Sequence, residues 1–213
     1  MTYIEGRTGL QTCPTGRQRG LLNHEIQIHN WHSRGYLIES APGGAPGLVI
    51  HGYGSSSAAM LGLAVGLAAC LPLRLLAFDL PGHAGAAGKK LTAAAAQAAM
   101  EDAAAALGEP AFFIGHSLGA RVGLTAGLPR AAIISMPGPA KFEGSRGELL
   151  RLLKPRRVNE AAPFAGLKEI LACPASPAPD TLMLSAAREP ESVRLLAREW
   201  RDAAIACHKI KDS

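Results

Sequence analysis

The sequence predicts a domain of the α/β class, in which helices cover both faces of a mostly parallel sheet. Short strand-like apolar runs alternate along the chain with longer, alanine-rich stretches that have the length of helices. Several strand-like runs are continuously apolar rather than alternating, which is typical of strands buried on both faces. The chain has 213 residues, a length that suits one domain with a sizeable core.

The first elements predict an antiparallel start to the sheet. Residues Leu22 to Ser40 alternate in polarity around Ser33-Arg34-Gly35, which predicts a β-hairpin. A turn is expected over Pro42 to Gly47, followed by a buried strand at Leu48-Val49-Ile50. The first helix is expected from about Ala58 to Leu71.

The strand–helix unit then repeats, which predicts parallel pairing. The expected elements are strand Leu73–Phe78, loop Asp79–Lys90, helix Thr92–Leu107, strand Ala111–Ile114, helix Leu118–Gly127 and strand Ala131–Ser135.

The alternation stops between Gly138 and Pro179. This stretch contains the helix-like pieces Glu143–Leu153 and Glu160–Ala172 but no strand-like run. An insertion here would lie over the carboxyl ends of the strands, where open α/β sheets bind ligands, so we expect a lid over about residues 138–179. The pattern resumes with strand Thr181–Ser185, helix Glu191–Trp200 and strand Ala203–Cys207.

Composition indicates a cytoplasmic protein. Residues 1–20 are polar and aperiodic, and Ile4-Glu5-Gly6-Arg7 spells an engineered protease site, so we expect a disordered or vector-derived leader before a domain over residues 21–213. No secretory signal pattern is present, and the longest apolar run, Leu61 to Leu73, is too short to cross a bilayer. The four cysteines form no Cys-x-x-Cys pair, which favours reduced thiols.

The charge pattern gives no sign of nucleic-acid binding, because the net charge of +5 is modest and no recognised module accompanies it. Basic residues do gather within the expected lid. One interpretation is that they attract an anionic substrate or an acyl group on an acidic carrier protein, and the other is a solvated helix face. The six residues are Lys141, Arg146, Arg151, Lys154, Arg156 and Arg157.

The most informative motif is Gly115-His116-Ser117-Leu118-Gly119, between a strand-like run and a helix-like stretch. This arrangement predicts a nucleophile elbow, in which the serine occupies a strained turn and the glycines avoid collisions with neighbouring backbone. The hydroxyl would lie at the amino end of a helix, which favours negative charge. The alternative is a serine that merely caps the helix.

Two further segments follow strands in the same order: His51-Gly52-Tyr53-Gly54 and Asp79-Leu80-Pro81-Gly82-His83. Together with the elbow they make the chain from about Leu22 to Ser213 resemble the α/β-hydrolase family. The resemblance implies that family's fold and a serine hydrolase that cleaves carboxylic esters or thioesters through an acyl-enzyme. It implies no metal or organic cofactor.

The resemblance also implies roles for individual residues. Ser117 matches the nucleophile, and the backbone N–H groups of Tyr53 and Leu118 match the oxyanion hole. The segment around Tyr53 has the alternative of a plain tight turn. Asp79, His83 and His116 are expected to be structural.

The acid and the base are less clearly marked. Glu189 takes the position of the family's acid after the seventh strand, although it or Glu191 could simply begin a helix. His208 is the only histidine after Glu189 and is the candidate base, yet Ile210 suggests that the strand continues and that His208 is only a strand residue. The chain ends before the loop that carries this histidine in the family.

We therefore expect an enzyme acting on a small ester or thioester. The rival hypothesis is a non-catalytic or C-terminally truncated binding protein on a hydrolase scaffold, since the terminal histidine is in doubt. Neither the substrate nor the oligomeric state follows from the sequence.

Overall fold

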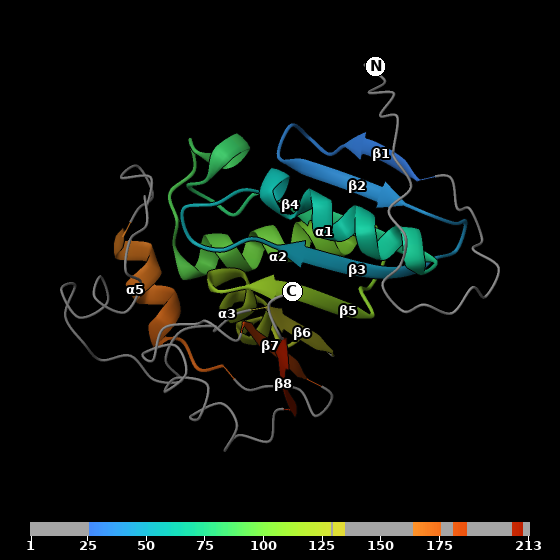
Figure 1. The fold of residues 1–213 in the computed structure, drawn as a ribbon. Helices are drawn as coiled ribbons and strands as arrows, with labels where there is room; N and C mark the ends of the chain where they lie inside the picture. Colours follow the sequence, from blue (N-terminus) through green and yellow to red (C-terminus); the bar gives the residue numbers. More distant parts are fainter. Residues whose placement is uncertain (1–25, 129, 135–163, 176–180, 187–205, 211–213) are drawn as a thin grey trace.

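The computed structural model describes residues 26–128, 130–134, 164–175, 181–186 and 206–210. Within these residues eight strands form one sheet in the order β1-β2-β4-β3-β5-β6-β7-β8 (Figure 1). Strand β2 pairs antiparallel with both β1 and β4, and all other neighbours are parallel, which confirms the mostly parallel sheet with an opening hairpin. The strands are β1 Gln27–Asn30, β2 Gly35–Glu39, β3 Ala45–Ile50, β4 Leu73–Phe78, β5 Phe112–His116, β6 Ala131–Ile134, β7 Leu182–Ala186 and β8 Ala206–Ile210.

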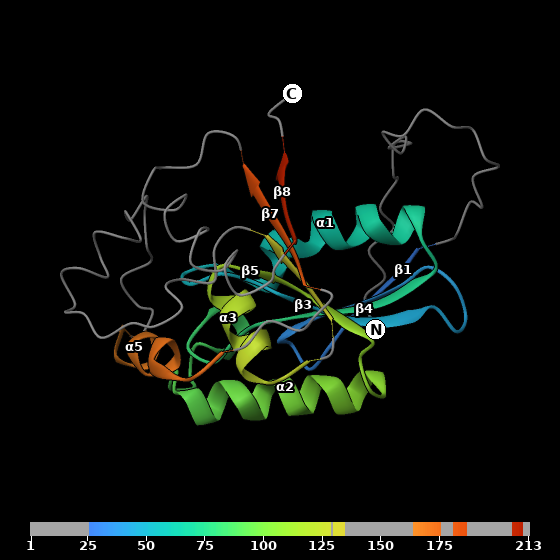
Figure 2. The ribbon, with the colours of Figure 1, turned by 90° about the horizontal axis from the view of Figure 1, so that it is seen from below.

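Helices cover both faces of this sheet (Figure 2). Helix α1 lies on one face, and α2, α3 and α5 lie on the other. The connection through α1 leads from β3 to β4, toward the β1 edge of the sheet. The connections through α2 and α3 lead toward the β8 edge. Because crossovers between parallel strands are right-handed, connections in opposite directions place their helices on opposite faces. The helices are α1 Ser57–Cys70, α2 Ala93–Leu107, α3 Leu118–Thr125 and α5 Phe164–Ala172.

Helix α3 packs very closely on the sheet at Gly123. A Cβ atom placed on Gly123 would collide with the ring of Phe113 in β5. Phe113 is fully buried in the cluster beneath α2 and α3. Glycine at position 123 therefore lets the helix backbone lie directly against the ring of Phe113.

The hairpin of β1 and β2 turns through two non-glycine residues with positive φ. His32 has φ +46° and Ser33 has φ +54°, and the N–H of Arg34 donates to the carbonyl of Trp31 at 2.8 Å. Positive φ at both central positions is the geometry of a type I′ turn, which normally carries Asn-Gly. The hairpin is confirmed. Its turn carries His32-Ser33, a pair that adopts positive φ less readily than Asn-Gly.

Helix α5 corresponds to the second helix expected in the lid, and it is attached to the core. Two hydrogen bonds from the Arg121 guanidinium, at 2.8 Å to the carbonyl of Leu171 and 2.7 Å to that of Cys173, hold its carboxyl end. At its other end, a Cβ on Gly166 would collide with the carbonyl of Leu91. Residues 135–163 lie outside the described residues, so the lid itself stays a prediction.

The predicted bounds of strands β3 and β5 are wrong by two residues or more. Strand β3 begins at Ala45, so the expected turn at Pro42–Gly47 is partly strand, because its pairing with β4 extends to that residue. Strand β5 continues to His116, since it pairs with β6 up to that residue. Strand β8 runs from Ala206 to Ile210, which confirms the expectation that this strand continues past Cys207 and that His208 lies within it.

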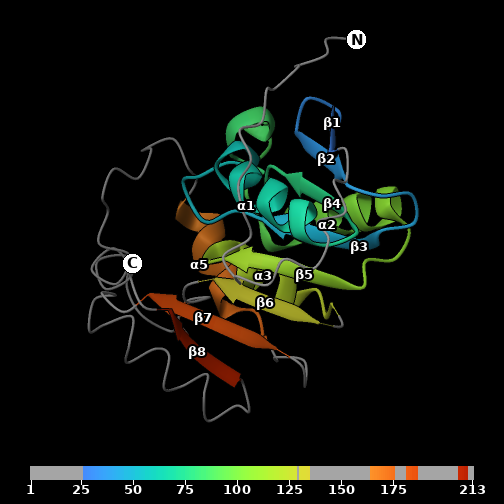
Figure 3. The same ribbon diagram turned by 45° about the vertical axis from the view of Figure 1, so that its right-hand side comes forward.

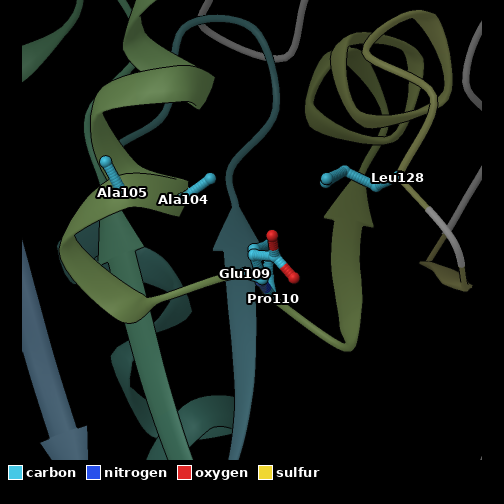
Figure 4. Close-up of a pocket in the computed structure, with 5 residues that line it drawn as sticks. All are labelled: Ala104, Ala105, Glu109, Pro110 and Leu128. Atoms are coloured by element: carbon cyan, nitrogen blue, oxygen red, sulfur yellow. The ribbon is translucent and has the colours of Figure 1, made fainter.

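A shallow cavity of about 360 Å³ opens at the amino end of β5, lined by Ala104, Ala105, Glu109, Pro110 and Leu128 (Figure 4). Ser117 follows the opposite end of this strand, so the cavity is separate from the elbow. Within the described ranges, no helix has the length and apolar character needed to cross a membrane.

Candidate active site

The turn between β5 and α3 has the strained backbone that the elbow motif predicts. Ser117 is its only residue, with φ +50° and ψ −112°. A non-glycine residue in such a conformation costs roughly 1–3 kcal/mol, and strain of this kind gathers at functional sites. The hydroxyl-bearing residue is thereby placed at the carboxyl edge of the sheet, where β5, β6 and β7 end side by side (Figure 3).

Both glycines of the motif are required by close contacts. A Cβ on Gly115 would collide with the Cα of Ala120. A Cβ on Gly119 would collide with the carbonyl oxygen of Ile50 and lie 2.6 Å from that of His51. The elbow is therefore pressed against the first turn of α3 and against the end of β3, as the glycine spacing predicts.

The Ser117 side chain does not cap α3. The residue occupies the cap position, yet its hydroxyl accepts no hydrogen bond from the first turn. N–H groups in the first turn of a helix have no acceptor within that helix, and Leu118 is the first residue of α3. The geometry thus argues against a capping role and leaves the amino end of α3, with its partial positive charge, beside Ser117.

The segment after β3 lies directly beside the elbow. Strand β3 pairs with β5 up to Gly115, so the two segments leave neighbouring strands at the same edge. A Cβ on Gly52 would lie 2.6 Å from Nδ1 of His116, the residue before Ser117. The structure therefore brings together the segments that carry Ser117, Leu118 and Tyr53.

His51 is fully buried beneath this segment and holds its backbone. Nε2 of His51 accepts a hydrogen bond from the N–H of Leu80 at 3.0 Å, so the proton of the neutral ring is assigned to Nδ1. Nδ1 donates to the carbonyl of Gly52 at 2.7 Å. Burial lowers the pKa of His51 to about 4, which keeps the ring neutral near pH 7.

These contacts set the direction of the Tyr53 N–H. The carbonyl of Gly52 also accepts from the N–H of Ser55 at 3.2 Å, so two donors fix its position. No described peptide bond is cis. In a planar trans peptide the N–H points opposite to the C=O, so fixing the Gly52 carbonyl also orients the N–H of Tyr53.

Asp79 has a structural role, as expected. Its carboxylate accepts from the N–H of Ser57 at 2.6 Å and from the N–H of Gly85 at 2.9 Å. It caps α1 in place of Ser56, whose side chain makes no capping bond, and ties the loop after β4 to that helix. Burial lowers the pKa of His83 and that of His116.

The predicted acid and base stay predictions. Glu189 lies outside the described residues. The backbone of His208 lies in the middle of β8, opposite Leu184, in a register row that continues through Ile134 to His116. Neighbouring strands are about 4.8 Å apart, so three spacings put the backbone of His208 about 14 Å from that of His116.

Two residues that matter here were missed in the sequence. His51 was treated only as part of a loop motif, although a histidine directly after a buried strand is a candidate for binding neighbouring backbone. Arg121 is 1% exposed and was not singled out, although it is the charged residue within an otherwise small and apolar helix.

Comparison with known proteins agrees with this geometry. The sequence profile described as the Alpha/beta hydrolase family matches residues 48–210. The chain belongs to the α/β-hydrolase family. No curated protein matches it significantly.

Solved structures of α/β-hydrolases resemble this one at low sequence identity. A marine microorganism esterase aligns with a TM-score of 0.58 at 11% identity, covering 84% of this chain and 92% of that one. MenH from S. aureus aligns with a TM-score of 0.60 at 13% sequence identity, covering 84% of this chain and 89% of that one. The thioesterase domain from the curacin biosynthetic pathway aligns with a TM-score of 0.55 at 15% sequence identity, covering 88% of this chain and 92% of that one. At these identities the likeness supports the fold alone.

Proposed function

We propose that this α/β-hydrolase is a serine hydrolase that cleaves carboxylic esters or thioesters through an acyl-enzyme. The observation that carries the proposal is Ser117, held with φ +50° at the amino end of α3 without capping that helix. The oriented Gly52–Tyr53 peptide and the Leu118 N–H on the neighbouring segments support it.

In the proposed reaction Ser117 Oγ attacks the substrate carbonyl carbon while a base takes the hydroxyl proton. The carbonyl oxygen becomes an oxyanion that accepts hydrogen bonds from the N–H groups of Tyr53 and Leu118, each worth about 3–4 kcal/mol. The intermediate collapses, and the alcohol or thiol leaves with the proton. Water then attacks the acyl-enzyme by the same route and releases the acid.

The base and acid of this mechanism are proposed to be His208 and Glu189. His208→Ala is expected to lower kcat by several orders of magnitude, as much as loss of Ser117, because such residues act as a unit. Glu189→Ala should cause a smaller loss. Unchanged kcat in His208→Ala would show that the proton goes to another group.

The substrate class is proposed from the neighbours. Structures described as an esterase and as a thioesterase domain share this fold, so a small ester or thioester is the substrate we propose. An anionic or carrier-linked acyl group remains a further proposal, because the basic residues between Lys141 and Arg157 lie outside the described residues.

A non-catalytic binding protein is the second candidate. The observation that favours it is the place of His208 in the middle of β8, three strands from β5. Such a protein would retain the elbow as architecture without turnover.

The decisive experiment compares wild type, Ser117→Ala and Ser56→Ala on p-nitrophenyl butyrate and on an acyl thioester. Ser117→Ala should lose about a thousandfold or more in kcat with little change in Tm, because a turn hydroxyl contributes little packing. Ser56→Ala is the matched control, since its side chain makes no capping bond. Turnover that survives in Ser117→Ala contradicts the proposal, and an inactive, folded wild type supports the binding protein.

A further inference from the structure

Three aromatic rings stand in a row around the segment that carries the proposed oxyanion donor. The ring centroid of His83 lies 5.0 Å from that of His51, edge to face at 62°. On the other side it lies 5.8 Å from the ring of Tyr53, at 80°. His51 and Tyr53 flank Gly52 in the sequence, so the imidazole of His83 contacts the side chains on both sides of this glycine.

Glycines stand on both sides of Tyr53. Tyr53 stands between Gly52 and Gly54, and Gly54 adopts φ +70°. Glycines supply no side chain and restrict the backbone least. The ring of Tyr53 is thus the only side chain in this three-residue stretch through which the surrounding protein can hold it.

His83 is itself fixed within the loop after β4. Its Nδ1 donates to the carbonyl of Pro81 at 3.0 Å, and its backbone N–H donates to the carbonyl of Leu80 at 3.0 Å. The N–H of the same Leu80 donates to His51 Nε2. Leu80 therefore binds both the backbone of His83 and the ring of His51, which fixes the two imidazole rings relative to each other.

The remaining nitrogen of His83 is unusual. Nδ1 carries the proton that Pro81 accepts, so Nε2 is an acceptor, and it is buried without a hydrogen-bond partner in the part of the chain that the structure describes. A buried acceptor without a partner is destabilising. Phenylalanine would make the ring contacts without that penalty, but it would lack the hydrogen bond to Pro81 that sets the plane of the ring.

We propose that His83 is a positioning residue for the oxyanion hole: its oriented ring holds the ring of Tyr53 and, through it, the Tyr53 N–H. His51 fixes the carbonyl side of the Gly52–Tyr53 peptide, and His83 fixes the side-chain end. The inference rests on the proposed function. An oxyanion donor acts on charge that develops in the transition state, so a displaced Tyr53 N–H should lower kcat and leave KM nearly unchanged.

The test is a double-mutant cycle on hydrolysis of p-nitrophenyl butyrate. His83→Asn keeps a donor near Pro81 but removes the ring, and Tyr53→Ala removes the contact while keeping the backbone N–H. Losing one oxyanion donor outright costs about a hundredfold or more in kcat, so a displaced donor should cost roughly tenfold in His83→Asn. Added to Tyr53→Ala, His83→Asn should change kcat by less than about twofold.

Three further variants complete the test. His83→Phe retains the ring contact and should keep kcat within roughly threefold of wild type. If His83→Asn does not fold, His83→Gln, which fills more of the ring's volume, replaces it in the cycle. His29→Asn, on the exposed strand β1, is the control and should match wild type, and urea midpoints are recorded for all variants.

The inference is overturned if the two losses in kcat multiply, if the loss lies in KM alone, or if His83→Asn keeps wild-type kcat. These outcomes would arise in an enzyme whose activity still depends on Ser117. An inactive wild type, or activity that persists in Ser117→Ala, would instead refute the proposed function and this inference with it.

Discussion

Acidification should destabilise this fold through His51. The ring is fully buried, its Nε2 accepts from the N–H of Leu80, and its Nδ1 donates to Gly52. Protonation would place a second N–H at Nε2, facing the Leu80 donor, and would bury a charge. Desolvation by burial accordingly lowers the pKa of His51 from its ordinary 6.5 to about 4 in the folded protein.

The sign and size of the effect follow from proton binding. Between pH 6.5 and about 4 the unfolded chain binds a proton at His51 that the folded chain does not. The free energy of unfolding is therefore highest above the unfolded pKa and falls as the pH is lowered through this window. At about 1.4 kcal/mol per pKa unit the loss from His51 alone approaches about 3 kcal/mol. The lowered pKa values of His83 and His116 act in the same direction.

Urea denaturation followed by circular dichroism between about pH 7 and pH 4.5 measures this loss, with His51→Asn as the comparison. The variant should be less stable at neutral pH, yet its stability should fall less steeply because the titrating ring is gone. NMR titration of the His51 ring gives its pKa independently. Equal slopes in the two proteins, or a His51 pKa near its ordinary value, would refute the account of a buried neutral ring.

Three substitutions test the packing around the site. Gly119→Ala should destabilise by about 1–3 kcal/mol in urea and reduce activity, because its Cβ meets the carbonyls of Ile50 and His51 at the end of β3. Gly62→Ala, in open space on α1, is its control and should be neutral or stabilising. Arg121→Met should lower the free energy of unfolding by about 3 kcal/mol or more, since two carbonyls of the α5 end lose a charged donor; unchanged urea midpoints would show that these bonds are dispensable. Replacing His32-Ser33 by Asn-Gly should stabilise by roughly 0.5–1 kcal/mol, read as a higher Tm, and a lower Tm would contradict the type I′ assignment.

The parts of the site that depend on local sequence were predictable. Glycine spacing around Ser117 reports contacts within a few residues of the chain and with the next strand, and those contacts are present. The sheet followed from the alternation of apolar runs with helix-length stretches. Both signals arise from backbone sterics and burial, which directly restrict the residue types at these positions.

The parts of the site that depend on long-range partners could not be predicted from the sequence. The partners of Arg121 lie 50 and 52 residues away, at the carboxyl end of α5, and nothing in the local sequence names them. The role of His51 depends on its hydrogen bond with Leu80, 29 residues further along the chain, which the local sequence does not indicate.

Covalent trapping of the nucleophile tests the central claim most directly. Wild type, Ser117→Ala and Ser56→Ala are treated with a fluorophosphonate probe, and the modified peptide is identified by mass spectrometry. The account predicts one probe per wild-type chain, attached to Ser117, full labelling of Ser56→Ala and none of Ser117→Ala. An unlabelled, folded wild type, or a probe attached to another residue, would contradict it.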